Sequence, residues 1–191
     1  QPRSSTNFLI EDAGAMAARY GMRRVQAEKV ARGDMDLAQT ALVELFQLMI
    51  GNNDYSTLSS LPGNPCCHNG RLIGDGESGY IPVPYDFDSS GLVNASYANP
   101  PEHLPIRRVT QRYFTGWCKQ PRHYRAAIER FNARRAQALA LFAESALLDK
   151  RYRKRTLAFI ESFYELINDE RQVQKKIIDR CRGEVIAYTQ G

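Results

Sequence analysis

Residues 50–91 form a polar stretch that interrupts an otherwise helix-forming sequence, and this interruption constrains the fold most strongly. The stretch is rich in Gly, Pro, Ser and Asn, which favour turns and short extended segments over helices. It also concentrates side chains suited to chemistry, namely Asp54, His68, Asn69, Asp86 and Asp88. We therefore expect the flanking helices to form a scaffold and this stretch to carry the function.

Two short strands are predicted within the stretch, at residues 71–73 and 80–87, joined by the turn GDGESG. The second contains two prolines that cannot donate ladder hydrogen bonds, so we expect an edge or irregular strand. Asp86 and Asp88 stand two residues apart and would project from one face of an extended strand. Hard oxygen ligands on one face suit Mg²⁺. The simpler alternative is that both carboxylates cap a turn before the following Ser-Ser-Gly.

The flanking sequence before the stretch predicts two helices. One covers residues 11–21 and ends at Gly21. The next begins after an N-cap at Asp34 or Asp36 and ends at Gly51, three residues before Asp54. Its wide apolar stripe predicts a helix that is buried on most of one side, with core residues Leu45, Phe46 and Met49.

From residue 121 onward the pattern predicts three antiparallel helices with short connections. In the first of them we expect a buried side made of Ala127, Ile128, Phe131, Ala138, Leu141 and Phe142. The expected fold is mainly α with a small β hairpin. The length fits a single domain over residues 1–191, with a half carrying the functional loops at 1–118 and a helical subdomain at 119–191.

Positive charge is concentrated in the C-terminal half. Residues 119–183 carry sixteen Lys or Arg against eight Asp or Glu, a net charge of +8. The densest cluster is KRYRKR at residues 150–155, which could meet nucleic acid, anionic lipid or an acidic protein. We favour a solvated helix face, and nucleic acid is disfavoured because no aromatic stacking platform or known motif accompanies the cluster. No apolar run approaches the ~18 residues of a transmembrane helix.

The four cysteines are Cys66, Cys67, Cys118 and Cys181, and no CxxC pair indicates a zinc site. One interpretation is two disulfides that tie Cys66 and Cys67 to Cys118 and Cys181, which implies an oxidising compartment. The other is four reduced thiols in a cytosolic protein. The residues alone do not separate the two.

Several enzyme classes are disfavoured by missing motifs. The sequence has no HExxH, no GxSxG elbow and no GxxxxGK[ST] loop, and its one GxGxxG match, GDGESG at residues 74–79, lies in a turn between two predicted strands rather than between a strand and a helix. Zinc hydrolases of the HExxH type, α/β-hydrolases and P-loop or Rossmann nucleotide-binding proteins are therefore poor matches.

The segments GNNDYS, HN and PVPYDFDSSGLVNASYA resemble a family of uncharacterised bacterial proteins related to atypical kinases. These kinases include the spore-coat kinase CotH, the HipA kinases and, more remotely, phosphoinositide kinases. The resemblance covers residues 8–118. It implies a protein-kinase-like C-terminal lobe, and an exported or periplasmic location that favours disulfides over free thiols.

The resemblance also implies roles for individual residues. Asp54 matches the catalytic-loop Asp, Asn69 the metal-binding Asn, and Asp86 the Asp of the DFG-like element, with Asp88 where protein kinases have Gly. We expect Asp88 to be a further metal ligand and Asn53 and His68 to support the site. The implied cofactors are Mg²⁺ and ATP, and the implied partners are a nucleotide and a protein substrate.

Two functions remain open at this point. The first is a kinase-like C-lobe carrying a metal-dependent phosphotransfer site. A kinase normally takes its glycine-rich loop and phosphate-anchoring Lys from an N-terminal lobe, and nothing before Asp34 supplies such a lobe, so it would be missing, rebuilt, lost or supplied by a partner segment. The second is a non-catalytic pseudokinase or binding domain of the cell envelope, whose acidic loop binds a cation structurally.

Overall fold

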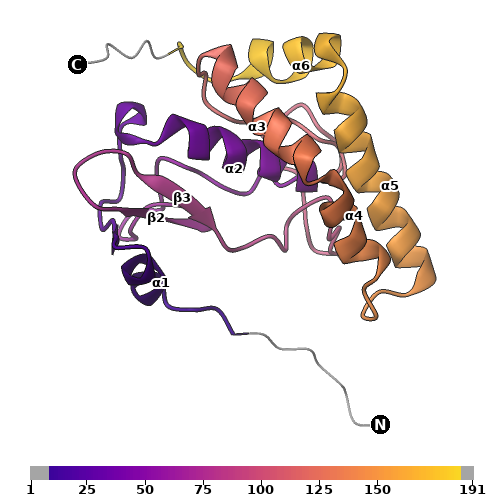
Figure 1. The fold of residues 1–191 in the computed structure, drawn as a ribbon, viewed down its shortest axis with the longest axis horizontal. Coiled ribbons are helices and arrows are strands. Elements are labelled where there is room, and N and C mark those ends of the chain that lie inside the picture. The colour runs from indigo at the N-terminus through magenta and orange to yellow at the C-terminus, as the bar shows by residue number, and fades with distance from the viewer. Residues whose placement is uncertain (1–8, 186–191) are drawn as a thin grey trace.

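The computed structural model describes residues 9–185, in which helices predominate beside a small antiparallel sheet (Figure 1). The mainly α prediction with a β hairpin is confirmed. Within this range no helix is long and apolar enough to cross a membrane. The elements are α1 (Ala13–Arg19), β1 (Arg23–Arg24), η1 (Arg32–Asp34), α2 (Leu37–Ile50), β2 (Gly70–Gly74), β3 (Ile81–Pro84), α3 (Pro121–Ala133), α4 (Arg135–Ala143), α5 (Lys150–Ile167), α6 (Glu170–Lys176) and η2 (Ile178–Arg180).

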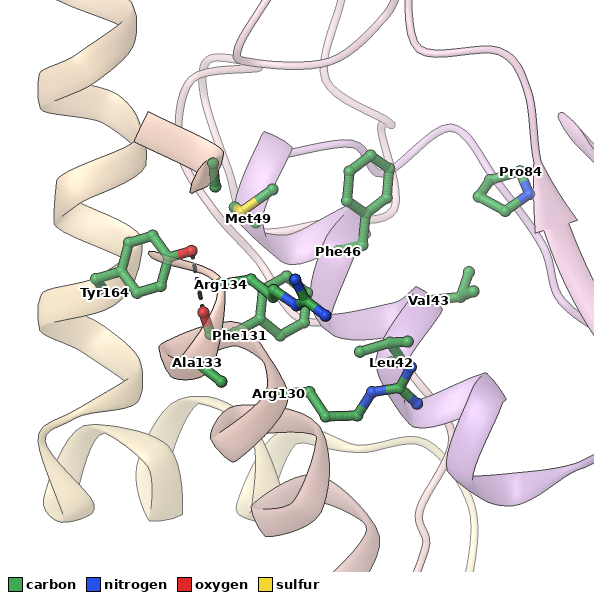
Figure 2. A pocket seen from close by; sticks show the side chains of 11 residues that line it. Leu42, Val43, Phe46, Met49, Pro84, Arg130, Phe131, Ala133, Arg134 and Tyr164 are labelled. Carbon is green, nitrogen blue, oxygen red and sulfur yellow. Dashed lines mark hydrogen bonds between the residues drawn. The ribbon is translucent and has the colours of Figure 1, made fainter. Parts of the chain in front are cut away.

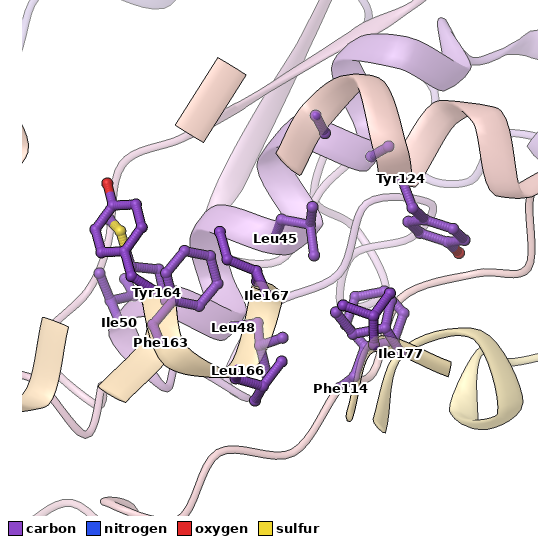
Figure 3. Packing of buried hydrophobic residues seen from close by; sticks show 14 of the residues in the cluster. Leu45, Leu48, Ile50, Phe114, Tyr124, Phe163, Tyr164, Leu166, Ile167 and Ile177 are labelled. Carbon is purple, nitrogen blue, oxygen red and sulfur yellow. The ribbon is translucent and has the colours of Figure 1, made fainter. Parts of the chain in front are cut away.

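Helix α2 is the central element. It begins because the Asp36 side chain accepts a hydrogen bond from Gln39 N, and it ends because Gly51 adopts a left-handed conformation with φ 65°. Helices α3 and α5 pack against it, and β3 contacts it as well (Figure 1). The main core lies between these helices, as Figure 3 shows, and includes Leu45, Leu48, Ile50, Phe114, Tyr124, Phe163, Ile167 and Ile177.

The sheet has the order β1-β2-β3, with antiparallel pairing throughout. The two predicted strands are present, and β1 adds a third on the outer side of β2. Strand β3 lies at the edge, as its prolines predicted, but it ends at Pro84. The predicted extension to residue 87 is therefore wrong, so Asp86 lies beyond the strand, in the loop after it.

The helix predicted to begin near residue 121 is in fact two. Helix α3 ends at Ala133 and α4 begins at Arg135, because Arg134 has φ −110° and ψ 6°. The break turns the following residues, and Leu141 is 74% exposed, so its predicted burial is wrong. Ala127 is buried, while Ile128, Phe131 and Phe142 pack against the core as partly buried residues.

All four cysteines are oxidised, but the predicted pairing is wrong. Cys66 bonds to its neighbour Cys67, and Cys118 bonds to Cys181. The Cα atoms of Cys118 and Cys181 lie 4.7 Å apart, within the usual ~4.4–6.8 Å range. This second bond ties the segment before α3 to the end of η2. The loop that holds Cys66 and Cys67 is not tied to the helical part by a disulfide.

Arg112 fixes the end of α2 against α5. Its guanidinium donates hydrogen bonds to Met49 O at 3.0 and 3.2 Å, to Ser162 Oγ at 2.8 Å and to Phe159 O. A cation at a helix C-terminus is favourable because the last carbonyls carry partial negative charge. Burial lowers the pKa of Arg112 to about 10. This anchor holds the point at which the chain leaves α2 toward Asp54.

Candidate functional site

Two glycines place the Asp54 loop beside the segment that follows Asp86. Gly91 N donates to Gly51 O at 3.0 Å, and Leu92 N donates to Ile50 O at 2.9 Å. A Cβ atom at Gly91 would lie 2.4 Å from Val109 O, so no larger residue fits this close backbone approach. The Asp54 loop and the segment that follows Asp86, distant in sequence, therefore lie side by side at the end of α2.

Asn52 connects the same two segments through its side chain. Its Oδ1 accepts a hydrogen bond from Asp54 N at 2.9 Å, and its Nδ2 donates to Asp86 O at 3.4 Å. Asn52 is 2% exposed, so both contacts are sheltered from water. It was not among the predicted site residues, although an Asn two residues before an Asp commonly forms this kind of turn.

Asp54, His68 and Asn69 form one cluster. His68 Nε2 lies 2.7 Å from Asp54 Oδ1, while Asn69 Nδ2 donates to Asp54 Oδ2 at 3.0 Å and to Asp54 O at 2.7 Å. The Asp54 and His68 side chains are 44% and 38% exposed. The carboxylate is thus held in one orientation by neighbours and still accessible from solvent.

The turn that carries Asn69 is short and tightly bonded. Cys67 N donates to Gly70 O, and Gly70 N donates to Cys67 O, both at 3.1 Å. Asn69 adopts a left-handed φ of 54°, which Asn tolerates better than most residues. Its carbonyl accepts a hydrogen bond from Tyr85 N at 3.3 Å. That bond places Asn69 next to the residue before Asp86.

The two acidic residues of the Asp-Phe-Asp segment have different surroundings. Among residues 9–185, Asp86 Oδ1 accepts only a long 3.4 Å hydrogen bond from Asp88 N. Asp88 accepts hydrogen bonds from Ser89 Oγ and Tyr97 Oη, each at 3.1 Å. Within the described chain, Asp86 is the less engaged carboxylate and Asp88 serves the following loop.

A polar cavity of about 230 Å³ opens beside the cluster. Its lining includes Asn69 and His68 from the cluster and the guanidinium-bearing Arg24 and Arg71 from β1 and β2. Arg24 Nε is buried and has no hydrogen-bond partner among residues 9–185. A cavity with two cations and an unpaired donor suits an anionic ligand. Arg24 could not have been found from local sequence, because the sheet pairing brings it here.

The side-chain oxygens of this site would fill only part of the coordination shell of Mg²⁺, and waters and substrate phosphates would fill the rest. Asn69 uses its amide nitrogen on Asp54, which leaves Oδ1 without a donor in the described structure. Asn53 Oδ1 is buried and unpaired in the same range. No group of three His, Cys, Asp or Glu side chains suited to a metal occurs among residues 9–185. Mg²⁺ commonly takes one or two protein carboxylates and completes its shell with waters and substrate phosphates.

A second polar cluster lies within the core and is closed to solvent. Lys119 Nζ lies 2.5 Å from Glu44 Oε2 and donates to Trp117 O at 2.8 Å, while Trp117 N donates to Glu44 Oε1 at 3.2 Å. Burial raises the pKa of Glu44 and lowers that of Lys119, and each charge opposes the shift of the other. This pair attaches the segment before α3 to α2.

Comparison with known proteins adds no relative: no family model, curated protein or solved structure matches this chain. The assignment of the site therefore depends on its own geometry.

Proposed function

We propose that this chain is a kinase-like C-terminal lobe carrying a metal-dependent phosphotransfer site. Asp54 would be the general base, and Asn69 and Asp86 would hold Mg²⁺ against the phosphates of ATP. The carrying observation is Asn69, whose amide nitrogen bonds both the carbonyl and the carboxylate of Asp54. This arrangement orients the base and directs the remaining amide oxygen elsewhere, as a metal-ligating Asn requires.

Each residue has a defined task in this proposal. Asp54 accepts the proton of an acceptor hydroxyl while the hydroxyl oxygen attacks the γ-phosphorus and ADP leaves. His68 contacts Asp54 Oδ1 at 2.7 Å and limits its rotation. Mg-ATP, when bound, supplies the phosphoryl group and neutralises its charge. Arg24 and Arg71, in the adjacent cavity, would contact the anionic phosphates.

The arrangement of elements supports the same proposal. The base follows the central helix α2. Asn69 immediately precedes β2 and Asp86 follows β3, so both implied ligands lie at the open end of the hairpin, where Gly70 pairs with Pro84. A protein hydroxyl is the proposed acceptor. The two disulfides fit an exported protein in an oxidising compartment such as a periplasm.

A non-catalytic binding domain is the second candidate. The observation that favours it is that the Ser89 and Tyr97 hydroxyls donate hydrogen bonds to the Asp88 carboxylate, which therefore stabilises the turn. In that case the acidic loop would bind a cation only for stability. The two candidates predict different results when Asp54 alone is replaced.

The test compares Asp54→Asn with Asp86→Asn by calorimetry with Mg-ATP and by transfer of labelled γ-phosphate. Asp54→Asn should keep nucleotide binding and lose transfer, because the amide keeps the shape but accepts no proton. Asp86→Asn should weaken Mg²⁺-dependent binding itself, because it removes a charge from the metal site. Asp75→Asn, an exposed carboxylate in the β2–β3 turn, is the matched control.

This chain alone should bind Mg-ATP weakly or not at all, because no nucleotide-covering lobe is evident, so the same titrations are run on a full-length version; the proposal fails if neither form binds Mg-ATP or transfers phosphate. If Asp86→Asn then changes only the thermal stability in divalent metal, the binding-domain candidate holds instead.

A further inference from the structure

A cavity of about 580 Å³ lies between α2, α3, α4 and α5, and Pro84 at the end of β3 also lines it. Figure 2 shows it bordered by the Phe46 ring and Leu42 of α2, with Pro84 beyond them and Tyr164 opposite. Such a volume is within the ~300–1,000 Å³ typical of sites for small organic ligands. The lining is mostly apolar: Leu42, Val43, Phe46, Met49, Pro84, Phe131, Ala133, Ala138 and Tyr164.

Two arginines are the charged residues of this lining. Arg130 and Arg134 come from the last turn of α3 and its cap, and both side chains are exposed. Arg134 Nη1 donates to Gln137 Oε1 at 2.9 Å, while the Arg130 guanidinium has no hydrogen bond or ion pair within the described part of the chain. No Asp or Glu lines the cavity in that part. Figure 2 shows both guanidinium groups beside the apolar side chains.

We propose that this cavity binds a single-chain amphiphile with an anionic head, such as a long-chain carboxylate. The tail would lie against Leu42, Phe46 and Phe131, and the head would meet Arg130 and Arg134. Burial of each methylene favours binding by a hydrophobic term, and a guanidinium can bind a carboxylate through two parallel hydrogen bonds. The two positive charges disfavour cationic ligands. The proposal does not depend on phosphotransfer.

A ligand at this position would also contact elements that lead to the polar site. Phe46 packs edge-on against Phe87, with ring centroids 5.5 Å apart, and Phe87 directly follows Asp86. Pro84, at the end of β3, lines the same cavity. Phe46 and Pro84 therefore line the cavity and also neighbour the Asp86 loop, although the cavity and the polar site are separate.

The first experiment measures binding of laurate by isothermal titration calorimetry below its critical micelle concentration. Saturable 1:1 binding is expected, with affinity rising by up to about fourfold for each methylene from octanoate to laurate. Dodecanol and dodecyltrimethylammonium, which share the tail, should bind at least tenfold more weakly. Absence of saturable binding, or equal affinity for the three head groups, would overturn the proposal.

Variants locate the site. Arg130→Gln together with Arg134→Gln should weaken laurate binding at least tenfold, while the binding of dodecanol stays unchanged. Ala138→Trp should block the cavity and remove both. The matched control is Arg151→Gln with Lys154→Gln, exposed cations of α5 outside the lining, which should bind laurate as the wild type does.

Folding is checked by far-UV circular dichroism and thermal unfolding. If Ala138→Trp does not fold, the arginine variant decides alone, because its positions are on the surface. If the control weakens binding as much as the arginine variant does, or if laurate binding survives in folded Ala138→Trp, binding is surface association and the cavity assignment is wrong.

Discussion

The Glu44–Lys119 pair and the Asp54–His68 pair use similar contacts at very different depths. The Glu44 and Lys119 side chains are 0% and 2% exposed, and their charges are satisfied by each other and by the backbone of Trp117. The Asp54 and His68 side chains are 44% and 38% exposed, and Asp54 is accessible beside a polar cavity. Contact distance alone would not tell these clusters apart.

The difference in depth separates a structural cluster from a candidate chemical one. Loss of one partner in a buried pair leaves an uncompensated charge, so stability depends strongly on both. An exposed pair contributes little to stability because water can replace either partner. A reactive group must also meet its substrate, which only the Asp54 cluster can do without unfolding. Four predictions test this contrast.

The largest effect is expected for Lys119→Met. It leaves Glu44 buried without its cation, so the free energy of unfolding should fall by about 3–5 kcal/mol in urea denaturation. Lys150→Met, at the exposed start of α5, should change little. Adding Glu44→Gln to Lys119→Met should recover part of the loss. A loss below about 1 kcal/mol for Lys119→Met would remove the contrast between the two pairs.

The two disulfides should also contribute unequally to the free energy of unfolding. Cys118 directly precedes Lys119 and closes a loop with a sequence separation of 63, so Cys118→Ser with Cys181→Ser should cost about 2–4 kcal/mol. Cys66→Ser with Cys67→Ser removes a bond between neighbours that constrains almost no chain entropy, so a smaller cost is expected. Thermal unfolding of both variants, without reductant, measures the difference; equal losses would contradict it.

His68→Asn should leave stability within about 1 kcal/mol of wild type, because the His68–Asp54 contact is exposed. Under the proposed function, phosphate transfer should fall while Mg-ATP affinity is retained, since the residue orients the base. Parallel urea titration and transfer assays separate the two. A stability loss comparable to that of Lys119→Met would make His68 a structural residue.

The smallest effect concerns pH. Burial lowers the pKa of His123, with Arg122 and Lys119 contributing, and its Nε2 is buried without a partner in the described chain. The unfolded state, with a pKa of about 6.5, therefore takes up the proton first as the pH falls. The stabilising contribution of neutral His123 is complete above about pH 6.5 and is lost as the pH falls through the pKa that His123 has in the folded state.

The measurement compares Tm between pH 8 and 5 for wild type and His123→Gln. The wild-type Tm should fall slightly more on acidification than that of the variant. His103→Gln, an exposed histidine, is the control. A steeper fall of the Tm in the variant would mean that folding raises the pKa of His123 rather than lowering it.

Local signals predicted the scaffold well. The end of α2 at Gly51 and the β2–β3 hairpin follow from capping, glycine and proline chemistry within a few residues. The break at Arg134 lacks such a signal, because neither Gly nor Pro marks it. The predicted clustering of Asp54 and Asn69 came from resemblance rather than from local rules.

Long-range contacts could not be predicted in this way. Glu44 was not singled out within the α2 pattern, since its partner Lys119 is 75 residues away. The disulfide pairing was missed for the same reason, because four cysteines allow three pairings and only the tertiary fold selects one. Arg24 reaches the polar cavity only through the pairing of β1 with β2.

The bond between Cys118 and Cys181 also makes a covalent ring that contains α3, α4, α5 and α6. The α4–α5 connection is a surface turn inside this ring, with Leu147 88% exposed. A protease that cuts there leaves both fragments linked, so the nicked molecule migrates as one chain on a gel until it is reduced. The helical region can thus tolerate a backbone break at this turn without losing a fragment to solution.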